Sequence, residues 1–478
     1  MRKLLITLSF FALLSCSDDF LEIPLEDRTP AEEFFVSEQD AIQAVNAMYA
    51  HQLEWLTSGF PYLAITQITS DDSNKGSNPG DAAFLNDFNN FTFNASAFVI
   101  NDYWTGQFRG INLANQVLTN VPEITMDENL KERLLAEAKF FRAYHYFNLV
   151  RTFGGVPIYE GLPEDGLYNI PRNSVEEVYA LIKEDLQEAA QTLPPNYGPD
   201  QLGRVTEGAA KSLLAKVHMY REEWPEVLQL TQEVMGMGYE LYDDYYELFR
   251  WQNEFNSEII FAIQSTADGN CESTSQYGQV QGVRAQFGWG FNSPSEDLAD
   301  AYEVNDVRRD ATILFVGETT QEGDLITAGN DPSNPIRYNQ KIYVSSENFR
   351  RNNCLENADS NIVIIRYAEV LLMNAEANLE LGNYEAALES LNEVRNRAGL
   401  EDLEFESEEQ LRLAIWHERR VELAQEGDRF FDLVRQGRAA EVFQALGTQF
   451  TPGVNEIFPI PANQISLSNN VLTQNPGY

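Results

Sequence analysis

Residues 361–400 carry the clearest structural signal in this sequence: NIVIIRYAEVLLMNAEANLELGNYEAALESLNEVRNRAGL. Apolar or small side chains recur there at steps of three and four residues, which is the spacing of one face of an α-helix. Gly382 interrupts the first run, and a second run begins at Tyr384 and ends at Gly399. Two helices joined by a short glycine-containing turn pack antiparallel, so this stretch predicts a helical hairpin.

A similar stretch occurs 160 positions earlier in the chain. Ala215 and Trp224 fall in register with Ala375 and Tyr384, and again a polar turn separates two helical runs. Each hairpin alone would leave an apolar face exposed, so the copies must stack on each other or on another part of the chain. The pattern favours a mostly α, tetratricopeptide-like fold over the alternative, an ordinary helical bundle.

The composition limits the kinds of partner that the protein can have. The chain has 478 residues, enough for one large domain or two to three ordinary ones with a sizeable core. It has 74 acidic and 33 basic residues and a formal net charge of −41, which argues against nucleic acid or an anionic membrane surface as partner.

The N-terminus has the pattern of a lipoprotein signal. Arg2 and Lys3 precede an apolar run that is too short to span a bilayer, and Ser15 precedes Cys16. The run Leu-Leu-Ser-Cys resembles a bacterial lipobox, in which residues 1–15 are removed and Cys16 becomes lipidated. The alternative is an ordinary secretory signal with a chance cysteine. We expect the lipid to be the only membrane anchor, since no later apolar stretch is long enough to span a bilayer.

Two further cysteines, Cys271 and Cys354, complete the cysteine content. An exported chain meets an oxidising compartment, so a disulfide between them is one expectation, and two free buried thiols are the other. Neither cysteine has neighbours at a spacing typical of metal sites, and no glycine-rich phosphate loop occurs. The sequence therefore predicts no metal or other cofactor.

Helical periodicity and its lapses divide the chain into regions. Residues 16–36 are polar and interrupted by proline, which predicts a lipidated tether. Residues 37–237 and 361–478 are predicted to be helical. In residues 238–360 the helical pattern lapses, which predicts a loop-rich, minor-β region. We expect residues 37–478 to form one compact, discontinuous domain whose helices hold ligand-binding loops.

Several longer motifs follow one another along the chain. They are AEAKFFRAYHYFNLVR at 136–151 with GGVP at 154–157, RYAEVLLM at 366–373, LNEVRNRAG at 391–399, ERRVELA at 418–424, RFFDL at 429–433 and NPGY at 475–478. Together with the lipobox they closely resemble the SusD/RagB family of outer-membrane nutrient-binding lipoproteins. The resemblance runs from the lipobox to the last residue.

The resemblance implies about eight core helices, paired as tetratricopeptide-like units, beside a loop-rich remainder. It also implies a lipid-anchored protein of the outer membrane that faces the cell exterior and captures oligosaccharide or polysaccharide. Such a protein passes its ligand to a SusC-like TonB-dependent transporter and does no chemistry on it. Some members of the family bind peptides, so a peptide-binding lipoprotein or a protein-interaction scaffold of the same fold is the alternative.

The residues offer little support for an enzyme. With 74 acidic residues, a carboxylate pair can be drawn almost anywhere, and all four histidines, His51, His145, His218 and His417, lie in predicted helices. His417-Glu418 does not begin a zinc motif, because Val421 stands where a second histidine is needed. We therefore expect the charged residues of the last motifs to be structural: Glu418, Arg419, Arg420, Glu422, Glu426, Arg429, Asp432 and Arg435.

A glycan site needs flat aromatic faces to stack on sugar rings and polar side chains to bond the hydroxyls. Two stretches predicted to be irregular, residues 59–91 and 276–292, offer both. The predicted ligand-binding residues are Trp289, Tyr277, Phe287, Phe291, Asp72, Asn74, Arg284 and Asn292. The alternative for Phe287 and Phe291 is a place in the core as loop anchors. Phe60, Tyr62, Asp71, Lys75 and Gln279 lie in the same two stretches.

The charge pattern bears on the kind of glycan. Net acidity disfavours a polyanionic ligand. A local patch of basic residues would overrule this expectation if the fold assembled it from Lys75, Arg284, Arg337 and Lys341.

Overall fold

The computed structural model describes residues 34–163, 169–266, 273–284, 286, 288–329, 331, 333–347 and 360–478. Cys16, Cys271, Cys354 and Phe287 lie outside these ranges, so the predicted lipidation, disulfide and ligand contact at these positions stay predictions. Within the described ranges, no helix combines the length and the apolar character that crossing a membrane requires.

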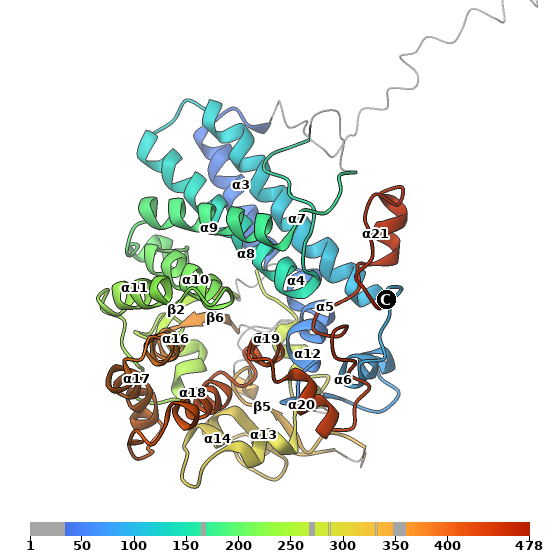
Figure 1. Ribbon diagram of the computed structural model, residues 1–478, viewed down its shortest axis with the longest axis vertical. Coiled ribbons are helices and arrows are strands. Elements are labelled where there is room, and N and C mark those ends of the chain that lie inside the picture. The colour runs from blue at the N-terminus through green and yellow to red at the C-terminus, as the bar shows by residue number, and fades with distance from the viewer. Residues whose placement is uncertain are drawn as a thin grey trace, which may run out of the picture.

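Long helices pack side by side in an arc (Figure 1). In chain order they are α7 (Phe98–Asn120), α8 (Glu128–Phe153), α9 (Val175–Thr192), α10 (Glu207–Met219), α11 (Trp224–Met235), α16 (Tyr367–Glu380), α17 (Tyr384–Arg397) and α18 (Glu408–Glu422). A further helix, α3 (Glu38–His51), packs on α7 and α8. α11 packs on α16 although the irregular middle region separates them in sequence. The predicted mostly α, tetratricopeptide-like array is confirmed.

Both predicted hairpins form, and they match residue by residue. α10 begins at Glu207 and α16 begins 160 positions later, and the same shift relates the first residues of α11 and α17. Gly382, in the turn of the second hairpin, has φ +79°, and Glu222 at the equivalent place has φ +56°. Glycine adopts this left-handed conformation without strain, whereas glutamate does not. The internal repeat therefore extends to the backbone geometry of the turn.

Shorter helices occupy the other side of the molecule (Figure 1). They are α4 (Trp55–Ser58), α5 (Phe60–Leu63), α6 (Asn86–Asn90), α12 (Tyr277–Gln281), α13 (Glu296–Ala301), α14 (Arg308–Thr312), α19 (Arg429–Arg435), α20 (Ala439–Ala445) and α21 (Ala462–Leu467). Much of this side belongs to the middle region and to the last 50 residues, which pack against the N-terminal helices.

There are three short antiparallel ribbons in the described residues; two connect the middle region to the two helical parts, and the third lies within the middle region. They pair β1 (Ser73–Gly76) with β3 (Phe291–Pro294), β2 (Ile259–Ile263) with β6 (Ile362–Arg366), and β4 (Ile313–Phe315) with β5 (Arg337–Asn339). β6 runs directly into α16, so one ribbon is continuous with the second hairpin. The strands belong to the minor-β part that the sequence predicts.

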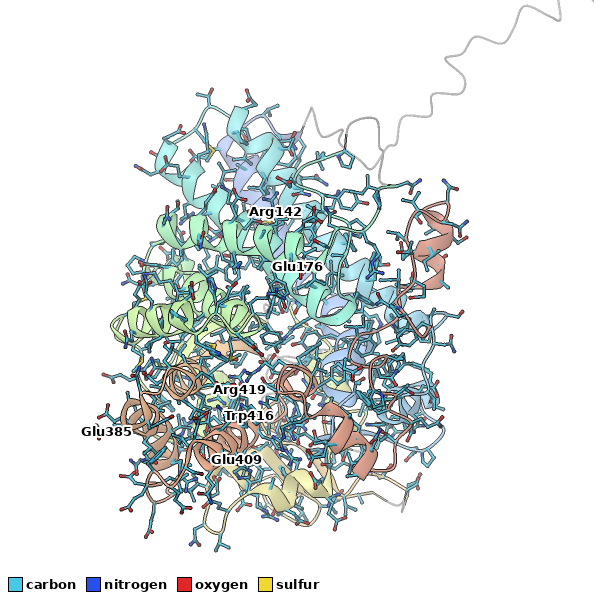
Figure 2. The ribbon with its side chains drawn as sticks, viewed as in Figure 1. Arg142, Glu176, Glu385, Glu409, Trp416 and Arg419 are labelled. Atoms are coloured by element: carbon cyan, nitrogen blue, oxygen red, sulfur yellow. The ribbon has the colours of Figure 1, made fainter. Side chains whose placement is uncertain are left out.

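Charged side chains lie both on the surface and in the interior. Glu176, Glu385 and Glu409 are exposed in the first turns of α9, α17 and α18, where the helix dipole favours a negative charge (Figure 2). Arg142 is instead buried, and its Nε and Nη2 each donate to a carboxylate oxygen of Asp185 at 2.7 Å. The acidic surface therefore surrounds arginines that are paired inside.

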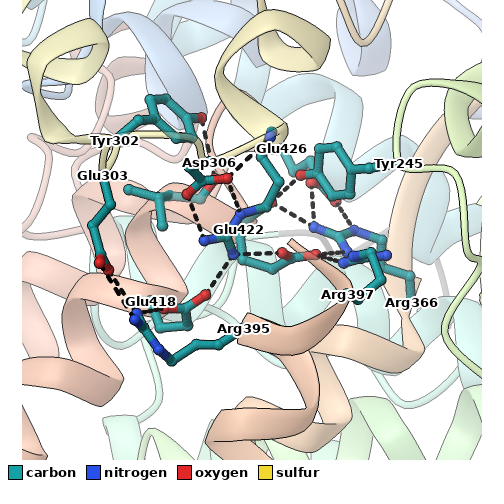
Figure 3. A network of polar contacts seen from close by, with 12 residues as sticks. Tyr245, Tyr302, Glu303, Asp306, Arg366, Arg395, Arg397, Glu418, Glu422 and Glu426 are labelled. Carbon is teal, nitrogen blue, oxygen red and sulfur yellow. Dashed lines mark hydrogen bonds and ion pairs between the residues drawn. The ribbon is translucent and has the colours of Figure 1, made fainter. Parts of the chain in front are cut away.

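The largest group of such pairs forms a buried ion cluster around α18 (Figure 3). Arg308 Nη1 donates to Glu418 at 2.5 Å and to Glu422 at 2.8 Å, and Arg366 Nη1 donates to Glu258 at 2.7 Å and also to Glu422. The members, which we call the ion cluster, are Glu258, Arg308, Lys341, Arg366, Arg395, Arg397, Glu418, Glu422 and Glu426. These contacts agree with the structural role expected for the charged C-terminal motifs.

Within the ion cluster, burial and the neighbouring charges shift the pKa of a buried group in opposite directions. Burial alone would raise the pKa of the Glu422 carboxyl, but Arg397, Arg366 and Arg308 together hold this pKa well below its usual value. Burial lowers the pKa of Lys341 to about 8, although Glu426 beside it acts in the opposite direction. Removing one member would leave its partners charged and buried.

We expect Glu422→Gln to lower the free energy of unfolding by about 3–5 kcal/mol, because it leaves buried arginines without their full countercharge. Urea denaturation measures this change. The low pKa of Glu422 stabilises the fold above the usual carboxyl pKa, and this contribution is lost as the pH falls below it. The difference between wild type and variant should therefore shrink on acidification.

Glu409→Gln in the same helix is the matched control, because Glu409 is exposed. It should change the free energy of unfolding by no more than about 0.5 kcal/mol. Equal effects at the two positions would show that the ion cluster does not stabilise the fold.

Candidate functional site

The β1–β3 ribbon brings together the two stretches that were predicted to bind a ligand. In its register Asn74 pairs with Ser293, and Gly76 pairs with Phe291. Both stretches contain short helices, among them α5, α6, α12 and a π-helix, η2 (Ala64–Ile68). The prediction that they are irregular throughout is therefore wrong, because their apolar side chains pack against the helical array and fix local turns.

Four of the predicted ligand-binding side chains lie in the interior. Tyr277 and Phe291 are each 4% exposed, Asp72 is 2% exposed and Asn292 is fully buried. The Tyr277 hydroxyl accepts a hydrogen bond from Gln67 Nε2 at 2.6 Å. Each of these groups has its partners inside the protein, so we do not propose that they contact a ligand directly.

Asn292 joins three chain segments below the ribbon. Its Nδ2 lies 2.5 Å from Gln67 Oε1, 2.8 Å from Gln281 Oε1 and 2.9 Å from Gln425 Oε1. The residue has φ +54°, a conformation that asparagine adopts more readily than most residues with a side chain. One side-chain amide thus connects η2, α12 and the segment after α18 to β3.

Buried ion pairs fix the residues that precede β1. Arg429 donates to the two carboxylate oxygens of Asp71 at 2.8 and 2.7 Å, and Arg420 Nε donates to Asp72 at 2.8 Å. Burial raises the pKa of Asp72. Burial also acts on Asp71, but the bonds from Arg429 hold the pKa of that carboxyl below its usual value. The start of the ribbon is therefore attached to α18 and α19.

Five partly exposed rings form a continuous row beside the ribbon. The Trp289 ring centroid lies 6.4 Å from that of Trp55 and 6.2 Å from that of Phe60. Phe60 lies 6.0 Å from Phe84, which in turn lies 4.8 Å from Phe98. Four of the rings are half-buried and Phe98 is 54% exposed. We call this row the aromatic strip.

Glycines allow the loop that carries Trp289 to pack closely. A Cβ at Gly288 would lie 2.4 Å from the backbone of Gly282, and one at Gly290 would lie 2.8 Å from the Cβ of Arg284. Gly290 also has φ +76°. A side chain at either position would displace the loop.

Polar groups flank the aromatic strip. Arg284 Nη2 lies 2.8 Å from Asp81 Oδ2, and Arg109 Nη1 lies 2.8 Å from Glu54 Oε2, next to Trp55 in the chain. All four side chains are partly exposed, as is Asn74 in β1. Of the predicted ligand-binding residues that the structure describes, Trp289, Arg284 and Asn74 are thus accessible, and their contact with a ligand remains a prediction.

The basic patch that would have overruled the expectation from net charge does not assemble. Lys75 Nζ is turned inward and donates to the carbonyls of Asn78 and Asp81, at 2.7 and 2.9 Å, and Lys341 belongs to the ion cluster. Arg337 donates through Nε to the carbonyl of Pro294 at 3.1 Å. A buried lysine needs hydrogen-bond or ionic partners close by. Because Lys75 and Lys341 find these partners inside the protein, neither ammonium group is on the surface.

The sequence-based reasoning found Trp289 and Phe60 but missed Trp55, Phe84 and Phe98. Trp55 and Phe98 lie in the region predicted to be helical, outside the two irregular stretches, and an aromatic residue of a helix is more often part of the core. Gly59 was one available sequence signal that the chain turns next to Trp55. It ends the short helix that begins at Trp55 and lies against the Trp55 ring.

We expect Asn292→Asp to lower the free energy of unfolding by roughly 2 kcal/mol or more, because a buried carboxylate would face three amide oxygens without a donor. Asn74→Asp, an exposed change in the partner strand, should stay within about 0.5 kcal/mol of wild type. Urea denaturation of the two variants measures the difference. Similar unfolding midpoints would contradict the role assigned to Asn292.

Comparisons with known proteins match almost the whole chain. The model described as SusD family matches residues 257–478, and the one described as starch-binding associating with outer membrane matches residues 20–219. A SusD-like protein of Formosa agariphila is 29% identical over 100% of both chains. The starch-binding protein SusD of Bacteroides thetaiotaomicron is 28% identical over 31% of this chain and 28% of its own.

A solved structure agrees with this match. It is a laminarin-binding SusD-like protein that is 32% identical in sequence, with a TM-score of 0.80. The similarity covers 93% of this chain and 100% of that one. The agreement therefore includes both helical parts and the region between them.

Proposed function

Because this chain belongs to the SusD family, we propose that it binds a glycan, without chemistry, by stacking sugar rings on the aromatic strip. The observation that carries the proposal is the continuous row of partly exposed rings from Trp289 to Phe98. Aromatic rings offer flat apolar faces, and the polar groups beside them are suited to sugar hydroxyls. Buried contacts hold the rings in place, which lowers the entropy cost of binding.

The charge favours a neutral glycan. The chain carries a formal net charge of −41, and the basic side chains that would have formed a cationic patch are turned inward or paired. Laminarin, a neutral glucan, is the first ligand to test, because a laminarin-binding SusD-like protein is 32% identical to this chain.

The setting that we propose is the cell surface. Lipid on Cys16 would anchor the protein to the outer membrane with its ligand-binding side facing the exterior, and a SusC-like TonB-dependent transporter would receive the glycan. The lipobox-like sequence and the family membership support this arrangement. Two carboxylates beside the strip, those of Glu54 and Asp81, are each in an ion pair.

We expect Trp289→Ala to weaken the binding of laminarin oligosaccharides at least about tenfold, which corresponds to about 1.4 kcal/mol of lost stacking. Isothermal titration calorimetry measures the affinity. Trp224→Ala is the matched control, since it removes the same ring from a half-buried place at the start of α11. This control should bind like the wild type.

Three other outcomes would change the proposal. Equal affinities of Trp289→Ala and Trp224→Ala would place the glycan elsewhere on the protein. Binding of peptides but of no glycan would favour the alternative, a peptide-binding lipoprotein of the same fold. Release of reducing sugar by the purified protein would contradict binding without catalysis.

A further inference from the structure

A cavity of about 400 Å³ lies apart from the aromatic strip, between α7, α21 and the segment around Tyr159. α21 packs against α7, as Figure 1 shows, and forms one wall. Its lining includes three aromatic rings and three side-chain amides, those of Trp104, Phe108, Tyr159, Asn112, Asn115 and Gln464. The volume is within the range of small-molecule sites.

The lining differs in charge from the rest of this acidic chain. Of all 478 residues 74 are acidic, but none of the described residues that line the cavity is, and Arg109, its one charged side chain, is paired with Glu54. By contrast, the hollow between the two hairpins is lined by Glu376 and Glu380, and one beside β4 by Asp243 and Asp244. The cavity is therefore suited to a neutral ligand.

Rings and amides are arranged for a ligand that is apolar on one face and polar at its edge. The ring centroids of Trp104 and Phe108 lie 4.7 Å apart, and those of Phe108 and Tyr159 lie 6.0 Å apart. Asn112 accepts a hydrogen bond from Gln116 at 2.9 Å, and its own Nδ2 donates none within the described part of the chain. Gln464 donates to Asn101 at 2.9 Å. In the part of the chain that the structure describes, the side-chain N–H of Asn112 and the side-chain carbonyl of Gln464 remain for a ligand.

Two observations place the cavity within reach of the end of the aromatic strip. Phe98, Thr105 and Arg109 are exposed on one face of α7, so the rise of the helix places the cavity about 10–16 Å from the strip's last ring. The cavity-lining Arg109 is also bonded to Glu54, which precedes Trp55 of the strip. A chain-like ligand on the strip would thus reach the cavity.

We propose that this cavity is a second subsite for the same neutral glycan, so that one long glycan chain occupies the strip and the cavity together. The proposal rests on the proposed function of the strip. Joining two weak sites through one ligand raises the apparent affinity without any new contact. Binding therefore strengthens with the length of the glycan beyond what the strip alone accommodates.

The test compares two asparagines of α7. Asn112→Ala removes the amide that lines the cavity, and Asn120→Ala removes a half-buried amide that is bonded to the same residue, Gln116, but lies outside the cavity. Each variant, and the wild type, is titrated with laminaribiose and with long-chain laminarin. Asn112→Ala should weaken binding of long laminarin about five- to tenfold, the usual effect of one lost hydrogen bond, and leave laminaribiose unchanged.

Asn120→Ala should bind both ligands like the wild type. If Asn112→Ala and Asn120→Ala both bind long laminarin as tightly as the wild type does, while Trp289→Ala binds it more weakly, the second subsite is wrong and the proposed function stands. If the wild type binds neither ligand, the laminarin-based form of both proposals fails. Loss of laminaribiose binding in Asn112→Ala would show that the cavity is the primary site, which also overturns the arrangement.

Discussion

Glu422 is buried among three arginines that come from three segments of the chain, and these contacts fix how the segments fit together. Arg308 comes from the middle region, Arg366 from the end of β6 and Arg397 from the end of α17. Charges of this kind are costly to bury unless each is paired, so the segments that carry them must come together in one arrangement. Apolar packing alone would hold the hairpins together, but it would not fix how the irregular middle region sits on them.

The same short segment that completes the ion cluster also positions the proposed binding surface. Arg420, two residues before Glu422, bonds to Asp72, and Gln425, three residues after it, accepts a hydrogen bond from Asn292. Arg429 then holds Asp71. These contacts fix the β1–β3 ribbon, and the ribbon in turn positions Trp289. A sequence motif that looks catalytic in composition is therefore a connection between the helical array and the aromatic strip.

Local patterns predicted the helices well because helix formation and hairpin packing depend on neighbours in sequence. The 160-residue repeat is an example, since it extends to the turn conformation of Glu222 and Gly382. The exposure of a ring depends instead on distant partners. Tyr277 is covered because Gln67 and Tyr62 reach it, and Phe291 because Phe60 packs on it, whereas Trp289 in the same stretch stays partly open. In the same way, the charged motifs near the C-terminus indicate structural ion pairs but do not identify the partners. Arg420, for example, bonds to Asp72, which lies 348 residues away in the chain.

Amide hydrogen exchange of the whole protein, with and without laminarin, shows whether a buried charged network holds a preformed aromatic surface. We expect residues 362–369 and 419–427 to exchange slowest in both states, because they unfold only with the whole domain. We also expect laminarin to slow exchange in residues 54–63 and 277–284. Protection by laminarin that is confined to the α10–α11 and α16–α17 hairpins, or rapid exchange around Glu422, would rule out this arrangement.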